Sequence, residues 1–248
     1  MENNLVSIII PLYNKEKYID ETINNIKKQT YKNWELIIID DCSEDNSYDI
    51  AKKHQCENIY ILKNQYNEGP AISRNKGLEK AVGRYICYQD ADDLWDEYKL
   101  EKQLKFMKEN NCAFSYTGFR YINKKGRIKR RINIQSELTY NEALKDIRIL
   151  TISTMFDLKK IEKCLLKMPN INSEEIATWW NILRNGYTAY GINEALVYYR
   201  KTKKSLTSNK LKSANNRWNI YRKYEKFSIP KSLYYFIHYV YYAIIKRL

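Results

Sequence analysis

The chain has 248 residues, of which 44% are hydrophobic, and a formal net charge of +14. This length suits one large α/β domain or two small ones, and 7 glycines with 4 prolines leave little room for flexible linkers. Five scattered cysteines without a C-x-x-C pair argue against a disulfide framework or a zinc site and predict reduced thiols. The first residues lack a signal-peptide pattern, and no stretch reaches the roughly 18 apolar residues of a membrane span. We therefore expect a soluble or peripheral protein.

In the first ninety residues, short apolar runs alternate with segments of helical periodicity. The expected strands are Val6–Ile10, Leu36–Ile39, Ile59–Leu62 and Tyr85–Tyr88, and the expected helices follow Asn14 and cover about 45–53 and 71–81. Asn14 is a plausible cap for the first helix. Strand–helix alternation with continuously apolar strands predicts a parallel sheet that is covered on both faces.

The second half is less regular. The expected elements are a strand near 113–116, a hairpin at 121–126, a helix after Ser173, and strands near 187–190 and 196–199. Ser173 is a candidate N-cap, and Glu174 and Glu175 would then be acids in a first helical turn. From local residues alone, this structural role is the favoured one for both glutamates.

Three carboxylates, Asp90, Asp92 and Asp93, directly follow the fourth expected strand. A divalent cation would relieve their mutual repulsion, and hard oxygen ligands suit magnesium or manganese. The alternative is a helix start, with Asp93 as the cap. Ligands of such sheets bind beyond the carboxyl ends of the strands, where residues 11–14, 40–41 and 90–92 should converge. This convergence favours the metal site.

Four motifs in order resemble the family 2 glycosyltransferases, which are inverting, nucleotide-sugar-dependent enzymes with the GT-A fold. They are Val6–Asn14, Ile39–Ser43, Gly69–Leu78 and Gln89–Trp95, the last matching the D-x-D motif. The resemblance implies an α/β fold with a mostly parallel central sheet. It implies a catalytic domain over 1–208, with a Rossmann-like nucleotide-sugar half (1–98) and an acceptor half (99–208). Residues 209–248 would form a helical tail.

The resemblance also implies roles for individual residues. The donor, most often a uridine diphosphate sugar, would bind at Pro11, Leu12, Tyr13, Asn14, Asp41, Arg74, Asp90, Ala91 and Asp92. Asp92, with Asp90 as a second candidate, would ligate Mn²⁺ or Mg²⁺. Glu175 would be the catalytic base, with Glu174 as the fallback, although the family usually has Asp at the position of Glu175. A closing loop would offer Arg200, Lys203 and Lys204 to the diphosphate, and Thr202 stands where many members have His.

The tail is basic and rich in tyrosine. Residues 201–248 contain twelve Lys and Arg against one acid, Glu225. An aromatic helix flanked by lysines suits an anionic membrane surface, and the alternatives are packing onto the domain or a homodimer. We expect a cytoplasmic enzyme, peripheral at the inner face of the plasma membrane, that acts on a glycan or lipid-linked acceptor in bacterial-type surface polysaccharide or lipooligosaccharide synthesis. A catalytically inactive carbohydrate-binding relative and a basic nucleic-acid-binding protein are the alternatives, and we expect no nucleic-acid partner.

Overall fold

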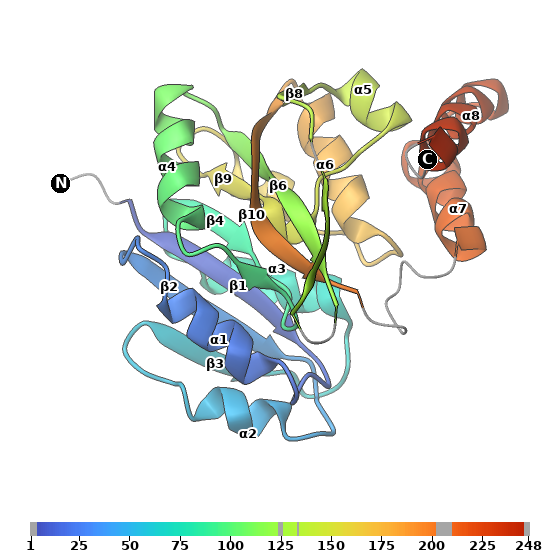
Figure 1. The fold of residues 1–248 in the computed structure, drawn as a ribbon. Helices are drawn as coiled ribbons and strands as arrows, with labels where there is room; N and C mark the ends of the chain where they lie inside the picture. Colours follow the sequence, from blue (N-terminus) through green and yellow to red (C-terminus); the bar gives the residue numbers. More distant parts are fainter. Residues whose placement is uncertain (1–3, 124–125, 133, 202–209, 246–248) are drawn as a thin grey trace.

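A computed structural model describes residues 4–123, 126–132, 134–201 and 210–245. Its centre is one mixed sheet with the strand order β3-β2-β1-β4-β9-β6-β10-β5, to which β7 and β8 add at β6 and β10 (Figure 1). The strands are β1 (Val6–Leu12), β2 (Trp34–Asp40), β3 (Ile59–Lys63), β4 (Tyr85–Tyr88), β5 (Leu94–Trp95), β6 (Phe114–Ile122), β7 (Ile128–Ile132), β8 (Glu137–Leu138), β9 (Met155–Asp157) and β10 (Ala189–Arg200). The first four are parallel, as predicted, and so are β6 and β10.

Helices cover both faces of this sheet (Figure 1). They are α1 (Ile19–Lys27), α2 (Ser47–Lys52), α3 (Pro70–Lys80), α4 (Lys99–Glu109), α5 (Tyr140–Lys145), α6 (Glu174–Arg184), α7 (Lys210–Asn219) and α8 (Ile229–Ile245), with short turns η1 (Thr151–Ser153), η2 (Lys163–Leu166) and the π-helical η4 (Ile220–Tyr224). Within the described ranges, no helix is long and apolar enough to cross a membrane.

The apolar strands supply two cores because successive side chains of a strand point to opposite faces. Ile9 and Ile37 belong to the core on one face, and Ile8 and Ile38 to the core on the other. All four side chains are at most 1% exposed. Burial on both faces explains why these strands show continuous apolar runs and no alternation with polar residues.

Three local predictions were wrong. Asn14 does not cap α1, which begins at Ile19 after Tyr18 without a side-chain cap. Ser173 precedes α6 but adopts a left-handed conformation (φ 61°) and makes no capping hydrogen bond. The two strands expected near 187–199 are one strand, β10, which pairs with β6 through two register shifts between Ile192 and Val197. The bulges interrupt the apolar pattern, which therefore looks like two strands in the sequence.

The tail helices pack on the domain beside α5 and α6 (Figure 1). Tyr221 is fully buried, stacks on Trp180 with ring centroids 5.1 Å apart, and donates a 2.6 Å hydrogen bond to the carbonyl of Leu144. Arg184 donates to the buried Glu225 at 3.0 Å. The beginning of the tail is therefore anchored to the second half of the domain.

Candidate active site

A cavity of about 820 Å³ lies at the carboxyl ends of β1, β2 and β4, where the sequence predicted a binding crevice. Most of the predicted site residues share its wall. They are Pro11, Leu12, Tyr13, Asp41, Arg74, Asp90, Ala91, Asp92, Glu174, Glu175 and Arg200. Asn14 is not among the lining residues. The structure thus brings together residues that lie up to about 190 positions apart in the sequence.

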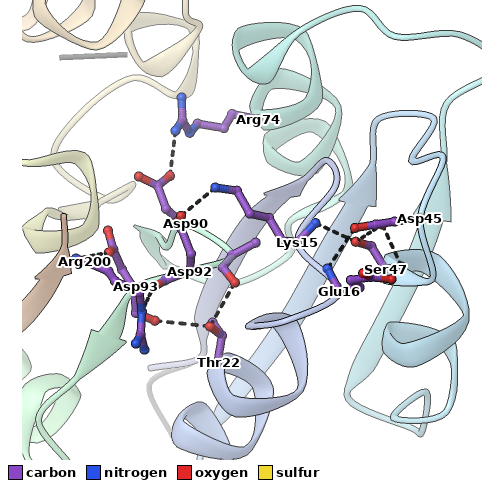
Figure 2. A network of polar contacts seen from close by, with 11 residues as sticks. Lys15, Glu16, Thr22, Asp45, Ser47, Arg74, Asp90, Asp92, Asp93 and Arg200 are labelled. Carbon is purple, nitrogen blue, oxygen red and sulfur yellow. Dashed lines mark hydrogen bonds and ion pairs between the residues drawn. The ribbon is translucent and has the colours of Figure 1, made fainter. Parts of the chain in front are cut away.

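The loop after β4 presents Asp90 and Asp92 to the cavity, and each carboxylate has a cationic partner (Figure 2). Nζ of Lys15 lies 2.5 Å from Oδ2 of Asp92, and Nη2 of Arg74 lies 2.7 Å from Oδ1 of Asp90. Thr22 of α1 fixes the loop by donating to the carbonyl oxygen of Ala91 at 3.1 Å. The charges of Asp90 and Asp92 are therefore each countered by a cationic side chain of the protein.

Asp93 does not cap a helix, and its carboxyl group is more deeply buried than that of Asp92. Leu94 and Trp95 form the short strand β5, and the Asp93 side chain is buried with Oδ1 accepting a 2.6 Å hydrogen bond from the main chain of Arg200. Burial, together with the charges of Asp90 and Asp92, raises the pKa of Asp93 well above its usual value. This carboxyl joins the acidic loop to the end of β10.

Lys15 is held in place by the first residue of α2 and the loop before it (Figure 2). Its main-chain N–H donates to Oγ of Ser47 at 2.6 Å, and Ser47 in turn donates to Asp45. Partial burial opposes ionisation of Asp45, but hydrogen bonds from Ser47 and from the Glu16 main chain outweigh it and lower the pKa of Asp45. The Lys15 backbone is therefore tied to a stable anion, and its side chain reaches Asp92.

Arg74 connects the two halves of the cavity. It lies on α3, is 7% exposed, and bridges Asp90 and Glu174. Oε1 of Glu174, on α6, lies 2.9 Å from Nη1 of Arg74. Burial opposes the charge, but both carboxylates more than offset it, so that the pKa of Arg74 lies above its usual value. In the structure Arg74 orients two acids of the site, and its expected role of supplying charge to the donor diphosphate stays a prediction.

The two glutamates at the start of α6 differ in their surroundings. Glu174 is paired with Arg74, whereas Glu175 has no ion pair within the described ranges. Burial and the adjacent Glu174 carboxylate raise the pKa of Glu175 to about 7, from 4.5 for an ordinary glutamate. A carboxylate with a pKa near neutrality can accept a proton and release it again, as a general base requires.

Asp41 and Asn14 hold loops together at the end of the cavity near β2. Oδ1 of Asp41 accepts hydrogen bonds from Asn64 at 2.7 Å and from the main chain of Glu68 at 2.9 Å, and Oδ2 accepts one from Gly69 at 2.8 Å. Asn14 accepts a 2.9 Å bond from the main chain of Glu44. With φ of 89°, Gly69 has a conformation that glycine adopts without strain, and it carries the chain into α3.

Arg200 ends β10 at the cavity wall, where its guanidinium serves the fold. Nε donates to the main-chain oxygen of Asp92 at 2.7 Å, and Nη2 donates to Glu21 at 2.8 Å. The ring of Tyr18 lies 4.9 Å from the guanidinium carbon. The other predicted loop residues, Thr202, Lys203 and Lys204, lie outside the described residues.

Sequence reasoning missed three parts of the site. Lys15 follows the predicted turn directly, and its charge next to that turn was a usable signal. The segment 149–152 also lines the cavity, but its apolar residues carry no functional pattern. Lys212, Ser213 and Asn216 of α7 complete the wall, whereas the sequence predicted no site residue in the tail and left packing onto the domain as an alternative to membrane contact.

The donor set fits a hard divalent cation. Asp90 and Asp92 present carboxylate oxygens to the cavity, whereas the buried Asp93 with its raised pKa is not part of this set. Over the same residues, no group of three or more His, Cys, Asp or Glu side chains is arranged to enclose a metal. Magnesium and manganese are commonly held by one or two carboxylates with substrate phosphates as further ligands, which matches this set.

Comparisons with known proteins agree with the motifs. The family model for glycosyl transferase family 2 matches residues 7–161. The chain is 41% identical over 248 residues to the putative teichuronic acid biosynthesis glycosyltransferase TuaG of Bacillus subtilis, with 98% of each chain covered. It is 33% identical to the UDP-Glc:alpha-D-GlcNAc-diphosphoundecaprenol beta-1,3-glucosyltransferase WfgD of Escherichia coli, covering 100% of this chain and 96% of the relative.

Among solved structures, S. aureus TarS 1-349 in complex with UDP-GlcNAc superposes with a TM-score of 0.72 at 23% identity. The match covers 88% of this chain and 64% of the TarS chain, and it shows a shared fold. The expected GT-A fold is thereby confirmed. Together, the extent of the family match and the full-length relatives show that the chain is a glycosyltransferase and belongs to glycosyl transferase family 2.

Proposed function

We propose that the enzyme transfers a sugar, with inversion, from a uridine diphosphate sugar to a hydroxyl of a lipid-linked glycan acceptor in bacterial surface polysaccharide synthesis. The observation that carries this proposal is that Glu175, with a pKa of about 7, lines the same cavity as Asp90 and Asp92. The UDP-Glc donor of WfgD and the UDP-GlcNAc bound in the TarS complex support a uridine diphosphate donor, and the diphosphoundecaprenol acceptor of WfgD supports a lipid diphosphate acceptor.

Glu175 is the proposed base. An acceptor hydroxyl must lose its proton as its oxygen attacks the anomeric carbon, and a carboxylate in hydrogen-bond reach can take that proton. Attack from the face opposite the departing nucleoside diphosphate inverts the configuration in one displacement. Glu174 remains the fallback, but its carboxylate is already engaged by the Arg74 guanidinium at 2.9 Å.

Asp92, with Asp90, is the proposed metal ligand, and Lys15 lies beside it. A bound Mn²⁺ or Mg²⁺ would neutralise charge that develops on the leaving diphosphate. Lys15 holds Asp92 from one side at 2.5 Å and is itself a candidate contact for a phosphate. The turn at Pro11–Tyr13 and Asp41 line the same cavity and are proposed to hold the uracil base.

The test combines a binding readout with turnover. UDP with Mn²⁺ should raise the melting temperature of the wild type by mass action, and Asp92→Ala should lose the manganese-dependent part. Transfer from a uridine diphosphate sugar and hydrolysis of that donor should be lost too. Asp49→Ala, at an exposed aspartate of α2, is the control. Undiminished transfer by Asp92→Ala would contradict the proposed site, and a wild type that turns over no nucleotide sugar would favour the inactive carbohydrate-binding alternative.

A row of exposed apolar side chains on α8 supports contact with an anionic membrane. Ile229, Leu233, Ile237 and Tyr241 recur every fourth residue and are 49–61% exposed. An amphipathic helix in a strongly basic tail is typical of proteins that bind the interface of anionic bilayers. We therefore propose a peripheral position at the inner face of the plasma membrane.

Ile237→Glu should abolish sedimentation with vesicles that contain phosphatidylglycerol and should leave the melting temperature unchanged. Tyr60→Glu, at an exposed residue of β3, is the control. If the wild type stays in solution with such vesicles and elutes as a dimer that Ile237→Glu dissociates, the row is a homodimer interface and the membrane proposal is wrong.

A further inference from the structure

A second cavity, of about 310 Å³, adjoins the first. Ile171, Asn172 and Asn216 line both cavities, so the space near Glu175 continues outward as a groove. Its far end is lined by Asn219, Lys223 and Tyr224, among others. These residues lie beyond position 161, where the match to the family model ends. The groove is thus built by the second half of the domain and by the tail.

The groove wall is rich in amide side chains that lack partners. Asn172, Asn216 and Asn219 make no side-chain hydrogen bond within the described part of the chain, and the latter two are half-buried. Each amide offers two donors and an acceptor, the set that the vicinal hydroxyls of a sugar satisfy. These amides are not among the buried polar atoms that lack a partner, so water solvates them and sugar hydroxyls can replace that water without breaking a hydrogen bond within the protein.

The groove-lining face of α7 and η4 carries a positive charge, Lys223, at the end away from the first cavity. Lys212, Asn216, Asn219 and Lys223 follow one another at intervals of four, three and four residues along α7 and η4, so they lie on one face of the helix. Lys223 is exposed and lies roughly 10 Å beyond Asn216 at 1.5 Å per residue. A sugar ring followed by a diphosphate covers this span, with the phosphates at the lysine.

We propose that this groove binds the acceptor as a sugar 1-diphosphate on a lipid, with the sugar at Asn216 and Asn219 and the phosphates at Lys223. This assignment rests on the proposed function. The sugar hydroxyl points inward to Glu175, and the lipid leaves near the start of α8, which follows Tyr224 after four residues and carries the exposed apolar row. The tail therefore takes part in acceptor selection.

Two probes separate the sugar contacts from the phosphate contact. They are α-N-acetylglucosaminyl diphosphate on a short alkyl chain, chosen after the acceptor in the name of WfgD, and the same alkyl glycoside without the diphosphate. Binding is measured by calorimetry with UDP and Mn²⁺ present. Asn216→Ala combined with Asn219→Ala should weaken the binding of both probes at least about tenfold. Lys223→Ala should weaken only the diphosphate probe, by about tenfold.

Matched controls are available on the same helix and on the surface. Asn215→Ala changes the neighbouring amide of α7, which lines neither cavity, and Lys53→Ala removes an exposed lysine beyond α2. Both should bind the probes as the wild type does. Alanine favours helix, so the tail variants should fold. The affinity for UDP should be unchanged in Lys223→Ala and in both controls, whose residues do not line the first cavity, and this separates the test from that of the donor site.

Unchanged affinity of the diphosphate probe in the groove variants would overturn the assignment. A wild type that binds UDP but neither probe would overturn it as well and would leave the donor site standing. Equal weakening of both probes by Lys223→Ala would contradict the phosphate contact and would mean that the groove recognises a sugar without its diphosphate. Failure of UDP binding itself would instead contradict the proposed function.

Discussion

The raised pKa of Glu175 predicts that Glu175→Gln makes the protein more stable and inactive at the same time. In the unfolded chain a glutamate ionises near pH 4.5, whereas the folded protein keeps the Glu175 proton until about pH 7. Between these values the folded state binds more protons, so the wild type loses unfolding free energy as the pH rises, and the loss is complete above pH 7. Glutamine does not titrate, so the unfolding free energy of Glu175→Gln does not include this loss.

The shift from 4.5 to about 7 corresponds to roughly 3 kcal/mol at 1.36 kcal/mol per pKa unit. The stability advantage of Glu175→Gln over the wild type, measured by urea unfolding, should therefore grow by about 2 kcal/mol between pH 5 and pH 8. Transfer should fall by about 10²–10⁴-fold, the usual contribution of a general base.

The control for activity is Glu57→Gln, at an exposed glutamate outside the cavity, which should transfer at the wild-type rate. The reasoning would be refuted if wild type and Glu175→Gln showed the same pH dependence of stability. It would also be refuted if Glu175→Gln kept its transfer activity within tenfold, since Glu175 would then not be the base.

Three further substitutions test the packing around the site. Arg74→Met removes both ion pairs of this buried arginine, one of them to the buried Glu174, and should lower the unfolding free energy by about 3–5 kcal/mol in urea; a loss below 1 kcal/mol would contradict the bridging role. Gly191→Ala would place a Cβ 2.0 Å from the carbonyl oxygen of Gln135, so thermal unfolding should show a loss of about 1–3 kcal/mol, and an unchanged melting temperature would argue against this close approach. Tyr221→Phe leaves the carbonyl of Leu144 without its 2.6 Å donor and should cost about 1–3 kcal/mol. Amide exchange in the tail should then accelerate, and unchanged exchange would contradict the anchor.

The first half of the fold, with strands β1 to β4, was predictable because its sequence signals are local. Runs such as Val6–Ile10 and Leu36–Ile39 are apolar because both faces of the sheet are covered, and polar residues begin where each strand leaves the core. Acidic residues at parallel strand ends must meet at one edge of the sheet. The placement of Asp41, Asp90 and Asp92 at one cavity therefore followed from the chain order alone.

The rest depends on contacts between distant segments. Asp93 has the sequence context of a helix cap, yet the main chain of Arg200 binds it from more than a hundred positions away. The pairing of Arg74 with Glu174 spans 100 positions, and no local pattern distinguishes Glu174 from Glu175. The contribution of α7 was missed because its asparagines line a groove that exists only once the helix packs beside α6.

The anchor of the tail and its groove face use different residues. Tyr221 and Arg217 pack against Trp180 and hold the helix in place. Asn216, Asn219 and Lys223 line the groove. Under the proposed acceptor site, substitutions on one side of a single helix would change the acceptor preference and would leave the donor half and the anchor intact. For engineering, the groove residues could then be replaced by those of a relative. Such a replacement should change the acceptor preference without redesign of the catalytic centre.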